Sequence, residues 1–306
     1  SSYPREMLTP RSSPMPSYST ITQTTMLRIV VTGGGGQLAT AIARRAMTSE
    51  HSYHFVSSRE VDICDTEALR RALEGVDIVI NTAAYTDVEA AEEQESEARR
   101  VNVIGVRNIA TLCLQMGIRL IHISTDYVFG GDSERCVPYA EGDAVAPINV
   151  YGQTKAEGEI EALKAPEAIV VRTSWLYAPW GKNFYRTIRR LAESQTEIRV
   201  VDDQRGRPTS ALSLADMLVT IIERGTYTRM SGTYHFSDCG EATWYDFATE
   251  IVRKTSCGRC SVVACRSEER PSKASRPRYS VLATDRIVDE CGIELRSWQE
   301  RLSEVI

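Results

Sequence analysis

The sequence predicts an α/β fold in which a doubly wound parallel sheet carries a smaller C-terminal α/β lobe. Short β-branched runs recur at residues 53–57, 77–81, 119–124 and 168–172, and segments typical of helices separate them. Strands that alternate with helices form parallel sheets with right-handed crossovers. Each run is apolar at consecutive positions, which is the pattern of strands that helices cover on both faces.

The predicted folded part opens with a strand, a glycine turn and a helix. The apolar run 29–31 predicts the strand, and four glycines follow it at 33–36. Leu38, Ile42 and Ala46 then recur at helical spacing, which gives the helix one apolar face to lay on the sheet. The turn therefore joins the first strand to a helix that packs on the sheet.

The glycine turn has the spacing G-x-x-G-x-x-A. Gly33 permits the sharp turn, Gly36 lets the backbone approach a pyrophosphate, and Ala39 permits tight packing of the helix. Gln37 and Leu38 stand at the helix N-terminus, where amide groups point at phosphates, and we expect them to bind the cofactor too. A flexible turn is the alternative interpretation, but the strand and the helix around it favour a dinucleotide fingerprint.

The residues after the second run bear on which dinucleotide binds. A site that prefers NAD places an acidic residue near the end of the second strand to hold the ribose diol. This chain reads Ser57-Ser58-Arg59-Glu60 there. Arg59 can pair bidentately with a 2′-phosphate and Ser58 can donate to it, so the segment favours NADPH. Glu60 leaves NADH open.

Small or polar residues follow the later strands, at 83–86, 125–127 and 173–175. Ligands of doubly wound folds bind beyond the carboxyl ends of the strands. These segments therefore predict the walls of a ligand crevice.

Tyr151 and Lys155 stand four residues apart in a predicted helix, so they project from the same face. A free phenol has a pKa of about 10, and an ammonium held beside it favours the phenolate. The pair can therefore form a proton donor tuned toward the working pH. The alternative is that the two residues have no catalytic role and form an exposed lysine above a half-buried tyrosine. The glycine fingerprint favours the proton donor.

After residue 174 the alternation loosens, and we expect a second lobe. The apolar helix 212–222 and the strand 233–237 are expected to return to the sheet. The predicted boundaries are 26–174 plus 211–239 for the dinucleotide-binding domain, and 175–210 plus 240–306 for the second lobe.

Charge and composition exclude several classes of protein. The net charge of -5 gives no overall basic field, so no nucleic-acid partner is expected. Residues 1–25 are rich in Ser, Thr and Pro and predict a disordered tail. We find no apolar run of membrane length and no export signal, so we expect a cytoplasmic protein.

The eight cysteines are expected to be free thiols in a reducing compartment. Cys257 and Cys260 have the spacing of half a zinc knuckle, but no second pair stands at partner spacing. Structural zinc is therefore not expected.

The motifs together carry a resemblance to a known family. The matching pieces are Gly33-x-x-Gly36-Gln37-Leu38, Asp62-Ile63, Asn81-Thr82-Ala83-Ala84-Tyr85-Thr86, Ser124-Thr125-Asp126-Tyr127-Val128-Phe129, Pro147-x-Asn149-Val150-Tyr151-Gly152-x-Thr154-Lys155, Arg172-Thr173-Ser174-Trp175-x-Tyr177, Asp203-Gln204-x-Gly206-x-Pro208-Thr209 and Arg276-Pro277-x-x-Ser280-x-Leu282. From about residue 26 onward the chain resembles the extended short-chain dehydrogenase/reductase superfamily, which has a Rossmann sheet, and within it the dTDP-4-dehydrorhamnose reductases.

The resemblance implies catalytic roles for three residues. Tyr151 would protonate a ketone oxygen of the sugar, and Thr125 would donate a hydrogen bond to that oxygen. Lys155 would hold the nicotinamide ribose and bias Tyr151. The chemistry agrees, because hydride delivery to a carbonyl builds negative charge on oxygen, where a positioned donor lowers the barrier.

The resemblance also implies binding residues. On the cofactor side these are Asp62 and Ile63 beside the adenine, with Ala83, Ala84 and Tyr85. On the substrate side they are Thr125, Asp126, Tyr127, Trp175 and Asn183. The stretch 253–286 is rich in Arg and Lys, so it suits the phosphates of a nucleotide sugar.

The implied reaction is the NADPH-dependent reduction of the 4-keto group of dTDP-4-dehydrorhamnose (dTDP-4-dehydro-6-deoxy-L-mannose) to dTDP-L-rhamnose. Two alternatives stay open: a 4-ketoreductase of another dTDP-deoxysugar, and a noncatalytic dinucleotide-binding regulatory subunit of the methionine adenosyltransferase type. Some family members bind magnesium at a dimer contact through a glutamate, but this chain has Ala41 there. No metal is therefore expected, and a homodimer is left open.

Overall fold

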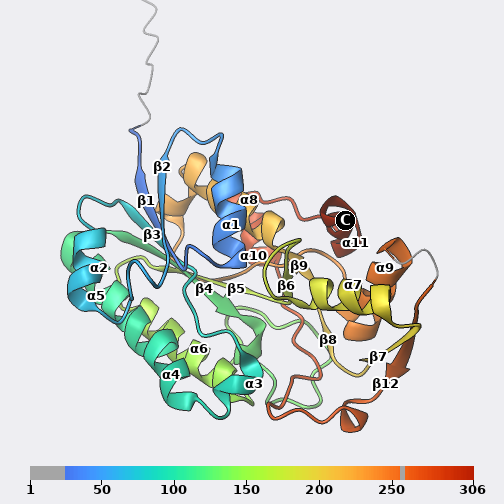
Figure 1. Cartoon of the computed structure of the whole chain (residues 1–306). Coiled ribbons are helices and arrows are strands. Elements are labelled where there is room, and N and C mark those ends of the chain that lie inside the picture. The colour runs from blue at the N-terminus through green and yellow to red at the C-terminus, as the bar shows by residue number, and fades with distance from the viewer. Residues whose placement is uncertain (1–24, 256–258) are drawn as a thin grey trace, which may run out of the picture.

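The structure is a computed structural model that describes residues 25–255 and 259–306 (Figure 1). The predicted tail 1–25, apart from its last residue, and Cys257 of the predicted half-knuckle lie outside the described residues. Within them, no helix is long and apolar enough to cross a membrane.

Six parallel strands form the central sheet, as predicted from the alternation. In spatial order they are β10 (Gly232–His235), β5 (Ile169–Thr173), β4 (Arg119–Thr125), β3 (Ile78–Asn81), β1 (Arg28–Thr32) and β2 (Ser52–Val56). The chain moves outward from β1 to β2 and then crosses to β3 on the other side of β1. Folds of this kind bind ligands at the carboxyl ends of the strands, near this change of direction.

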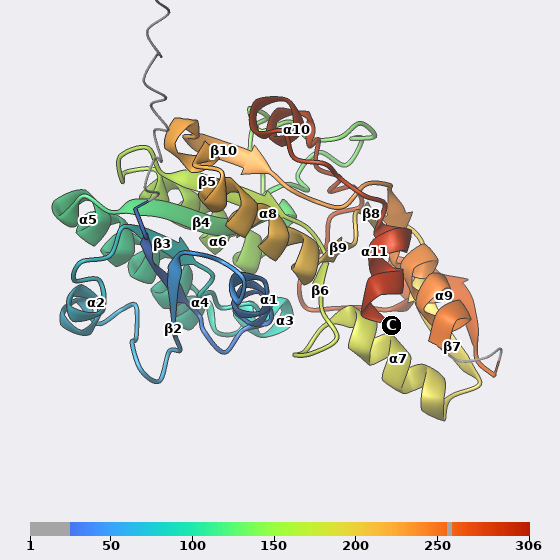
Figure 2. The same cartoon turned by 90° about the horizontal axis from the view of Figure 1, so that it is seen from above.

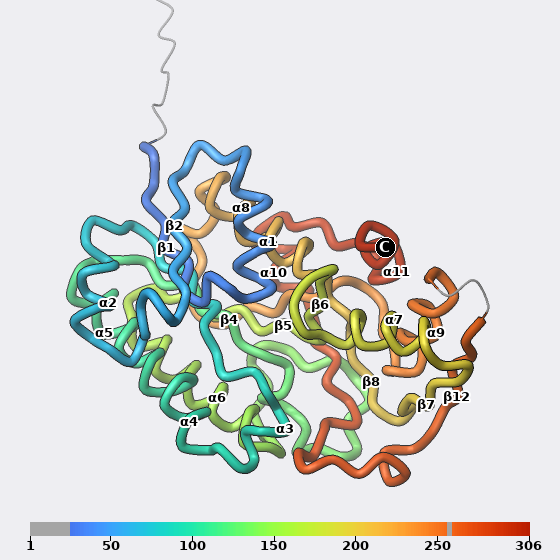
Figure 3. Tube along the Cα trace, in the orientation of Figure 1, coloured from blue at the N-terminus to red at the C-terminus, as the bar shows by residue number. Residues whose placement is uncertain are grey.

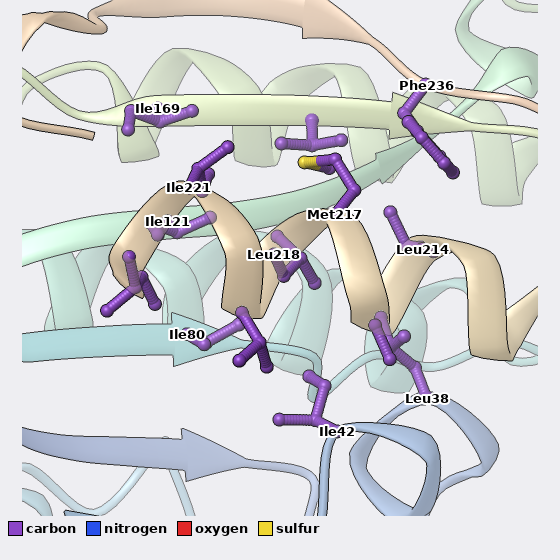
Figure 4. Packing of buried hydrophobic residues seen from close by; sticks show 14 of the residues in the cluster. Leu38, Ile42, Ile80, Ile121, Ile169, Leu214, Met217, Leu218, Ile221 and Phe236 are labelled. Atoms are coloured by element: carbon purple, nitrogen blue, oxygen red, sulfur yellow. The ribbon is translucent and has the colours of Figure 1, made fainter. Parts of the chain in front are cut away.

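One face of the sheet is covered by α1 (Gln37–Ala46) and α8 (Ala211–Glu223), which pack against each other. Figure 4 shows Leu38 and Ile42 of α1 meeting the apolar side chains of α8 above the sheet. The predicted helical spacing thus places these residues in the core.

The opposite face is covered by α2 (Thr66–Ala72), α5 (Val106–Met116) and α6 (Val150–Ala162). Between β3 and α5 lie α3 (Val88–Ala91), α4 (Glu95–Arg99) and a π-helical segment Arg100–Gly105. Figure 2 shows α8 on one side of the sheet and α6 on the other, the doubly wound arrangement that the sequence predicts.

A second group of elements has its own apolar core beside the sheet. It contains α7 (Phe184–Ser194), α9 (Trp244–Thr255), α11 (Trp298–Val305), and the paired strands β7 (Glu197–Val201) and β12 (Ser261–Cys265). Two further short pairs form sheets of their own, apart from the central sheet: β6 (Leu176–Tyr177) with β9 (Thr209–Ser210), and β8 (Arg205–Gly206) with β11 (Ala242–Thr243). In Figure 3 these elements gather on one side of the molecule.

One helix of the C-terminal segment packs on the main sheet. Helix α10 (Asp285–Cys291), which falls in the range predicted for the second lobe, contacts β10. Ile287 and Cys291, four residues apart on the helix, are buried in the same core cluster as α1 and α8. Through these two residues α10 packs on the main sheet. The chain then continues to α11, which belongs to the second group of elements.

Candidate active site

A large cleft of about 2780 Å³ runs along the carboxyl ends of the sheet strands and continues between them and the second group of elements. Pockets for one small ligand usually measure about 300–1,000 Å³. This cleft therefore has room for two extended ligands, such as a dinucleotide and a nucleotide sugar.

The glycine turn forms one end of the cleft. Gly33 has φ +72°, and a Cβ there would lie 2.8 Å from the Ala83 backbone nitrogen and 2.9 Å from Thr82 Oγ1. Only glycine fits this position without strain. Helix α1 starts at Gln37, and its N-cap residue Gly36 has no side-chain cap, which leaves the first amide groups of the helix for an anion. The residues present thus fit a dinucleotide pyrophosphate.

The segment after β2 lies on the cleft wall with Ser58 and Arg59, whereas Glu60 does not. The Glu60 carboxylate turns back and accepts hydrogen bonds from the backbone nitrogen and the hydroxyl of Ser57, at 2.8 and 2.7 Å. Arg59 is exposed and makes no ion pair with a described residue. The Arg59 guanidinium is therefore free to bind a phosphate. The Glu60 carboxylate, which could have held a ribose diol, is bound to Ser57 instead.

Asp62 and Ile63 also lie on the wall, as the resemblance implies. Asp62 accepts from the Cys64 backbone nitrogen and pairs with Arg100 at 3.0 Å. These contacts lower the pKa of the Asp62 carboxyl, so it is ionised at neutral pH.

The loop after β3 brings Ala83, Ala84 and Tyr85 to the cleft. The buried side chain of Asn102 holds this loop, because it accepts from the Tyr85 backbone nitrogen at 2.8 Å and donates to the Tyr85 carbonyl at 3.2 Å and to Thr154 Oγ1 at 3.1 Å. Asn102 belongs to the π-helical segment, a feature frequent at functional sites. The role of Asn102 could not be predicted from the sequence, because a one-residue change of helical period leaves no local motif.

Tyr151 stands in the first turn of α6, whose N-cap is Asn149. Asn149 Oδ1 accepts from the Gly152 backbone nitrogen at 2.7 Å, and a Cβ at Gly152 would collide with the Tyr127 carbonyl oxygen. The helix start is thus pressed against the segment after β4. The rings of Tyr151 and Tyr127 meet edge to face at 6.0 Å.

The proton affinity of Tyr151 differs from the prediction. Burial raises the pKa of its phenol above the usual value, and a hydrogen bond from the Thr125 hydroxyl counteracts this only in part. The Lys155 ammonium donates to the Ile123 carbonyl oxygen at 2.7 Å, and burial lowers its own pKa to about 8. The predicted lowering of the Tyr151 pKa is therefore not found, since desolvation dominates and the ammonium is engaged elsewhere.

Thr125 is the last residue of β4, Asp126 and Tyr127 follow it, and all three lie on the wall. Thr125 Oγ1 accepts from the Tyr127 backbone nitrogen at 3.1 Å. The Tyr127 hydroxyl accepts from Arg276 at 3.3 Å, and Arg276 pairs with Glu89 at 2.7 Å. The C-terminal segment thus closes over the residues that end β4.

Trp175 faces the cleft and stacks on Trp244, with ring centroids 3.6 Å apart and planes 7° from parallel. Its φ of +45° is rare for a bulky residue, and outliers of this kind concentrate at functional sites. A Cβ at Gly206 would lie 2.5 Å from Trp175 Cε2, so the indole occupies space that only a glycine leaves. Trp175 is a ligand contact that the resemblance implies, whereas Trp244 was not predicted, because it comes from far along the chain.

Asn183 and Gln37 lie on the wall, but their amides serve the fold. Asn183 caps α7 by accepting from the Arg186 backbone nitrogen at 3.0 Å, and it donates to Gln37 Oε1 at 3.1 Å. Gln37 Nε2 donates to the Leu176 carbonyl oxygen at 3.2 Å. These side chains tie α1 to the second lobe, and the ligand contacts predicted for them stay predictions.

The basic stretch 253–286 divides between the cleft and the surface. Arg253 pairs with Glu250 on its own helix, and Arg286 pairs with Glu290. The arginines of this stretch that reach the wall are Arg266, Arg270, Arg276 and Arg278, and Arg199 of β7 joins them. Arg199, Arg266 and Arg276 pair with Glu269, Asp202 and Glu89, whereas Arg270 and Arg278 form no ion pair with a described residue and are open to an anionic ligand.

Ala41 is fully buried in the core cluster of α1 and α8. The position that carries a glutamate in some relatives therefore offers no ligand at the surface. Within the described ranges, no group of three or more His, Cys, Asp or Glu side chains is arranged to hold a metal ion. The metal-free site stays a prediction.

Fold and cleft together define a protein of the extended short-chain dehydrogenase/reductase class. The family model described as "RmlD substrate binding domain" matches residues 27–306. The dTDP-4-dehydrorhamnose reductase of Mycolicibacterium smegmatis is 39% identical over 281 residues, which cover 91% of this chain and 85% of that protein. The chain belongs to the dTDP-4-dehydrorhamnose reductase family.

Two further relatives extend this comparison. The dTDP-4-keto-6-deoxy-D-glucose reductase of Streptomyces niveus is 36% identical, with 90% of this chain and 96% of that protein covered. The crystal structure of dTDP-4-dehydrorhamnose reductase from Bacillus anthracis in complex with NADP is 34% identical and superposes with a TM-score of 0.86, covering 92% of this chain and 98% of that chain.

Proposed function

We propose that this protein is an enzyme that uses NADPH to reduce the 4-keto group of dTDP-4-dehydrorhamnose, giving dTDP-L-rhamnose. One observation carries the proposal: Tyr151 and Thr125 meet at the carboxyl end of β4, in the same cleft as the glycine turn. A ketone held between these hydroxyls and a nicotinamide would have both parts of the reaction at hand. Membership of the reductase family supports the choice of substrate.

NADPH is the cofactor that the cleft fits. When bound with its pyrophosphate at the N-terminus of α1, the reduced nicotinamide supplies a hydride. Arg59 and Ser58 bind the 2′-phosphate, while Glu60 is held by Ser57 and does not compete for a ribose diol. The B. anthracis relative with NADP supports this preference.

Tyr151 acts as the general acid. Burial keeps its phenol protonated at neutral pH, so a proton is ready when negative charge develops on the ketone oxygen. Thr125 donates a hydrogen bond to the same oxygen and stabilises that charge. Lys155 lies one helical turn from Tyr151, where its ammonium can leave the Ile123 carbonyl to hold the nicotinamide ribose.

Trp175 and the arginines position the substrate. The indole of Trp175, backed by Trp244, offers a flat apolar wall for the 6-deoxysugar. The arginines of the C-terminal segment offer charge for the diphosphate. Asp126 and Tyr127 complete the wall on the side of the ketone.

A direct assay tests the proposal. The protein is incubated with dTDP-4-dehydro-L-rhamnose and NADPH or NADH, and oxidation of the reduced cofactor is followed by absorbance. We expect turnover with a lower KM for NADPH than for NADH. Absence of turnover with both cofactors would remove the reductase assignment.

A 4-ketoreductase of another dTDP-deoxysugar is the second candidate, because the S. niveus relative carries such a name at 36% identity. The two candidates share the proton donor and differ in the 4-keto sugar that they reduce. An NMR spectrum of the product, with each 4-keto sugar offered separately, decides between them. The homodimer and the cytoplasmic location stay predictions, and sedimentation of the purified protein tests the first.

A further inference from the structure

Thr125 has one hydroxyl proton, and two acceptors compete for it. Thr125 Oγ1 donates to Asp126 Oδ1 at 3.2 Å, and the same hydroxyl is hydrogen-bonded to Tyr151. The Tyr127 backbone nitrogen already donates to Oγ1. Under the proposed function, on which this inference rests, Thr125 must donate toward the ketone oxygen. A hydroxyl that gives its proton to Asp126 cannot do so.

The surroundings of Asp126 bear on this competition. Its side chain is buried, with 2% of the residue exposed, and Ser280 Oγ donates to Oδ2 at 2.5 Å. Within the described residues no Lys, Arg or His forms an ion pair with it. A buried carboxylate without a cation is costly, and burial raises the pKa of Asp126 to about 7. Both carboxyl oxygens therefore face hydroxyl groups in a site that disfavours charge.

We propose that Asp126 works as a neutral carboxylic acid that aims the hydroxyl of Thr125. Its Oδ1–H donates to Thr125 Oγ1, while Oδ2 accepts from Ser280. Oγ1 then accepts from Asp126 and from the Tyr127 backbone nitrogen, so its own proton points at the ketone oxygen. Asp126 and Ser280 are positioning residues that act through Thr125. No bond to carbon changes in this step, and the proton of Asp126 stays on Asp126.

The titration of Asp126 can be distinguished from that of its neighbours. Tyr127 on the same segment has a pKa raised to about 12 by burial, and the pKa of Tyr151 on α6 is raised further. Arg276, which pairs with Glu89 beside Tyr127, stays charged because its pKa is raised. These groups do not titrate near neutrality.

Lys155, with a pKa lowered to about 8, is the neighbour that titrates in the working range. Its titration is common to wild type and to variants of Asp126. The ratio of their activities therefore reports the Asp126 proton.

The experiment compares the kcat of wild type and Asp126→Asn between pH 6 and pH 9. The amide of the variant donates to Thr125 and accepts from Ser280 at every pH, as the neutral acid does. In wild type the neutral acid is lost with rising pH, so we expect the ratio of variant to wild-type kcat to rise about tenfold or more across this range. A ratio that is flat or falls with pH would overturn the proposal. Asp126→Ala, which has no donor, should have a low kcat already at pH 6, where the kcat of Asp126→Asn stays near that of wild type.

Ser280→Ala gives a second measurement. The Ser280 hydroxyl bonds to the carboxylate and favours the charged form, so its removal raises the pKa of Asp126. We expect the alkaline fall of kcat to move to higher pH. If the alkaline fall of kcat stays at the same pH or moves to lower pH, Ser280 has a purely structural role and the proposal is contradicted.

Infrared spectroscopy of the protein alone separates this inference from the proposed function. At pH 6 the carbonyl stretch of a neutral buried carboxyl should be present in wild type and lost in Asp126→Asn. Asp238, also buried and with a pKa raised to about 6, supplies a reference band that both proteins share. A missing Asp126 band with normal turnover would sink the inference alone. A present band without turnover on any 4-keto sugar would sink the proposed function alone.

Discussion

The two ends of the cleft are made of different kinds of atoms. At the glycine turn the wall consists of backbone atoms. Consecutive glycines have no side chains there, so the backbone amide groups can reach a phosphate. At the sugar end the wall is side chain, and each contact joins distant parts of the chain, as Trp244 backs Trp175 and Ser280 holds Asp126. The first end can be altered in few ways without losing the cofactor. The second can vary with the ligand, which fits a family whose members are named for different sugars.

Tyr151 stands where the two ends meet, and its loss should have the largest effect. We expect Tyr151→Phe to lower kcat by about 10²–10⁴-fold, because the ketone oxygen loses its proton donor. The dissociation constant of NADPH, measured by quenching of tryptophan fluorescence, should stay within about twofold of wild type, since the ring remains. Tyr53→Phe, which removes the hydroxyl of a partly buried residue of β2, is the control and should turn over normally. Near-normal turnover of Tyr151→Phe would exclude Tyr151 as the acid.

Gly33→Ala tests the main-chain end. The substitution places a methyl group against Ala83 and Thr82 at a left-handed backbone position, so the turn must shift. We expect a loss of about 1–3 kcal/mol in the free energy of unfolding and a clear rise in the KM for NADPH. Gly117→Ala is the matched control, because Gly117 has a similar φ of +70° outside the cleft and nothing lies within 4 Å of the added Cβ. If both variants bound NADPH equally well, the cradle would not depend on the missing side chain.

Gly206→Ala tests the side-chain end. The new methyl group would collide with the indole of Trp175, which stacks on Trp244. We expect the KM for the sugar nucleotide to rise about tenfold, roughly 1.4 kcal/mol of binding energy, while NADPH binding is unchanged. Gly142→Ala, where the added Cβ meets no atom within 4 Å, should behave as wild type. A rise in the KM for NADPH instead would show that the two ends are not separable.

The same contrast decides what could be predicted from sequence. The alternation of strands and helices, the glycine turn and the pair Tyr151 and Lys155 follow from local spacing, so the fold class and these residues of the cleft are accessible from the sequence, whereas the order of the strands is not. Trp244 and the role of Ser280 were not, because their partners are set by tertiary packing, with Ser280 standing 154 residues from Asp126.

Polar side chains on the wall were harder to interpret than apolar ones. Asn183 has the chemistry of a ligand contact, but whether an amide caps a helix or meets a ligand depends on which backbone group comes near. The sign of the Tyr151 shift was missed for a related reason. Spacing reveals the neighbouring ammonium but not the depth of burial, and burial is the larger cause.

Substitution of Arg59 should have the smallest effect of these variants, and it tests the cofactor end of the cleft most specifically. Because its exposed guanidinium makes no ion pair with a described residue, we expect Arg59→Ala to weaken NADPH binding by only about fivefold to tenfold. NADH lacks the 2′-phosphate, so its dissociation constant should not change. Arg71→Ala on the exposed face of α2 removes the same charge away from the cleft and controls for the overall field. Since salt screens exposed charges, the NADPH effect should shrink as ionic strength rises. An equal loss for NADH and NADPH would mean that Arg59 supports the loop rather than the phosphate, and the preference for NADPH would then need another source on the same wall.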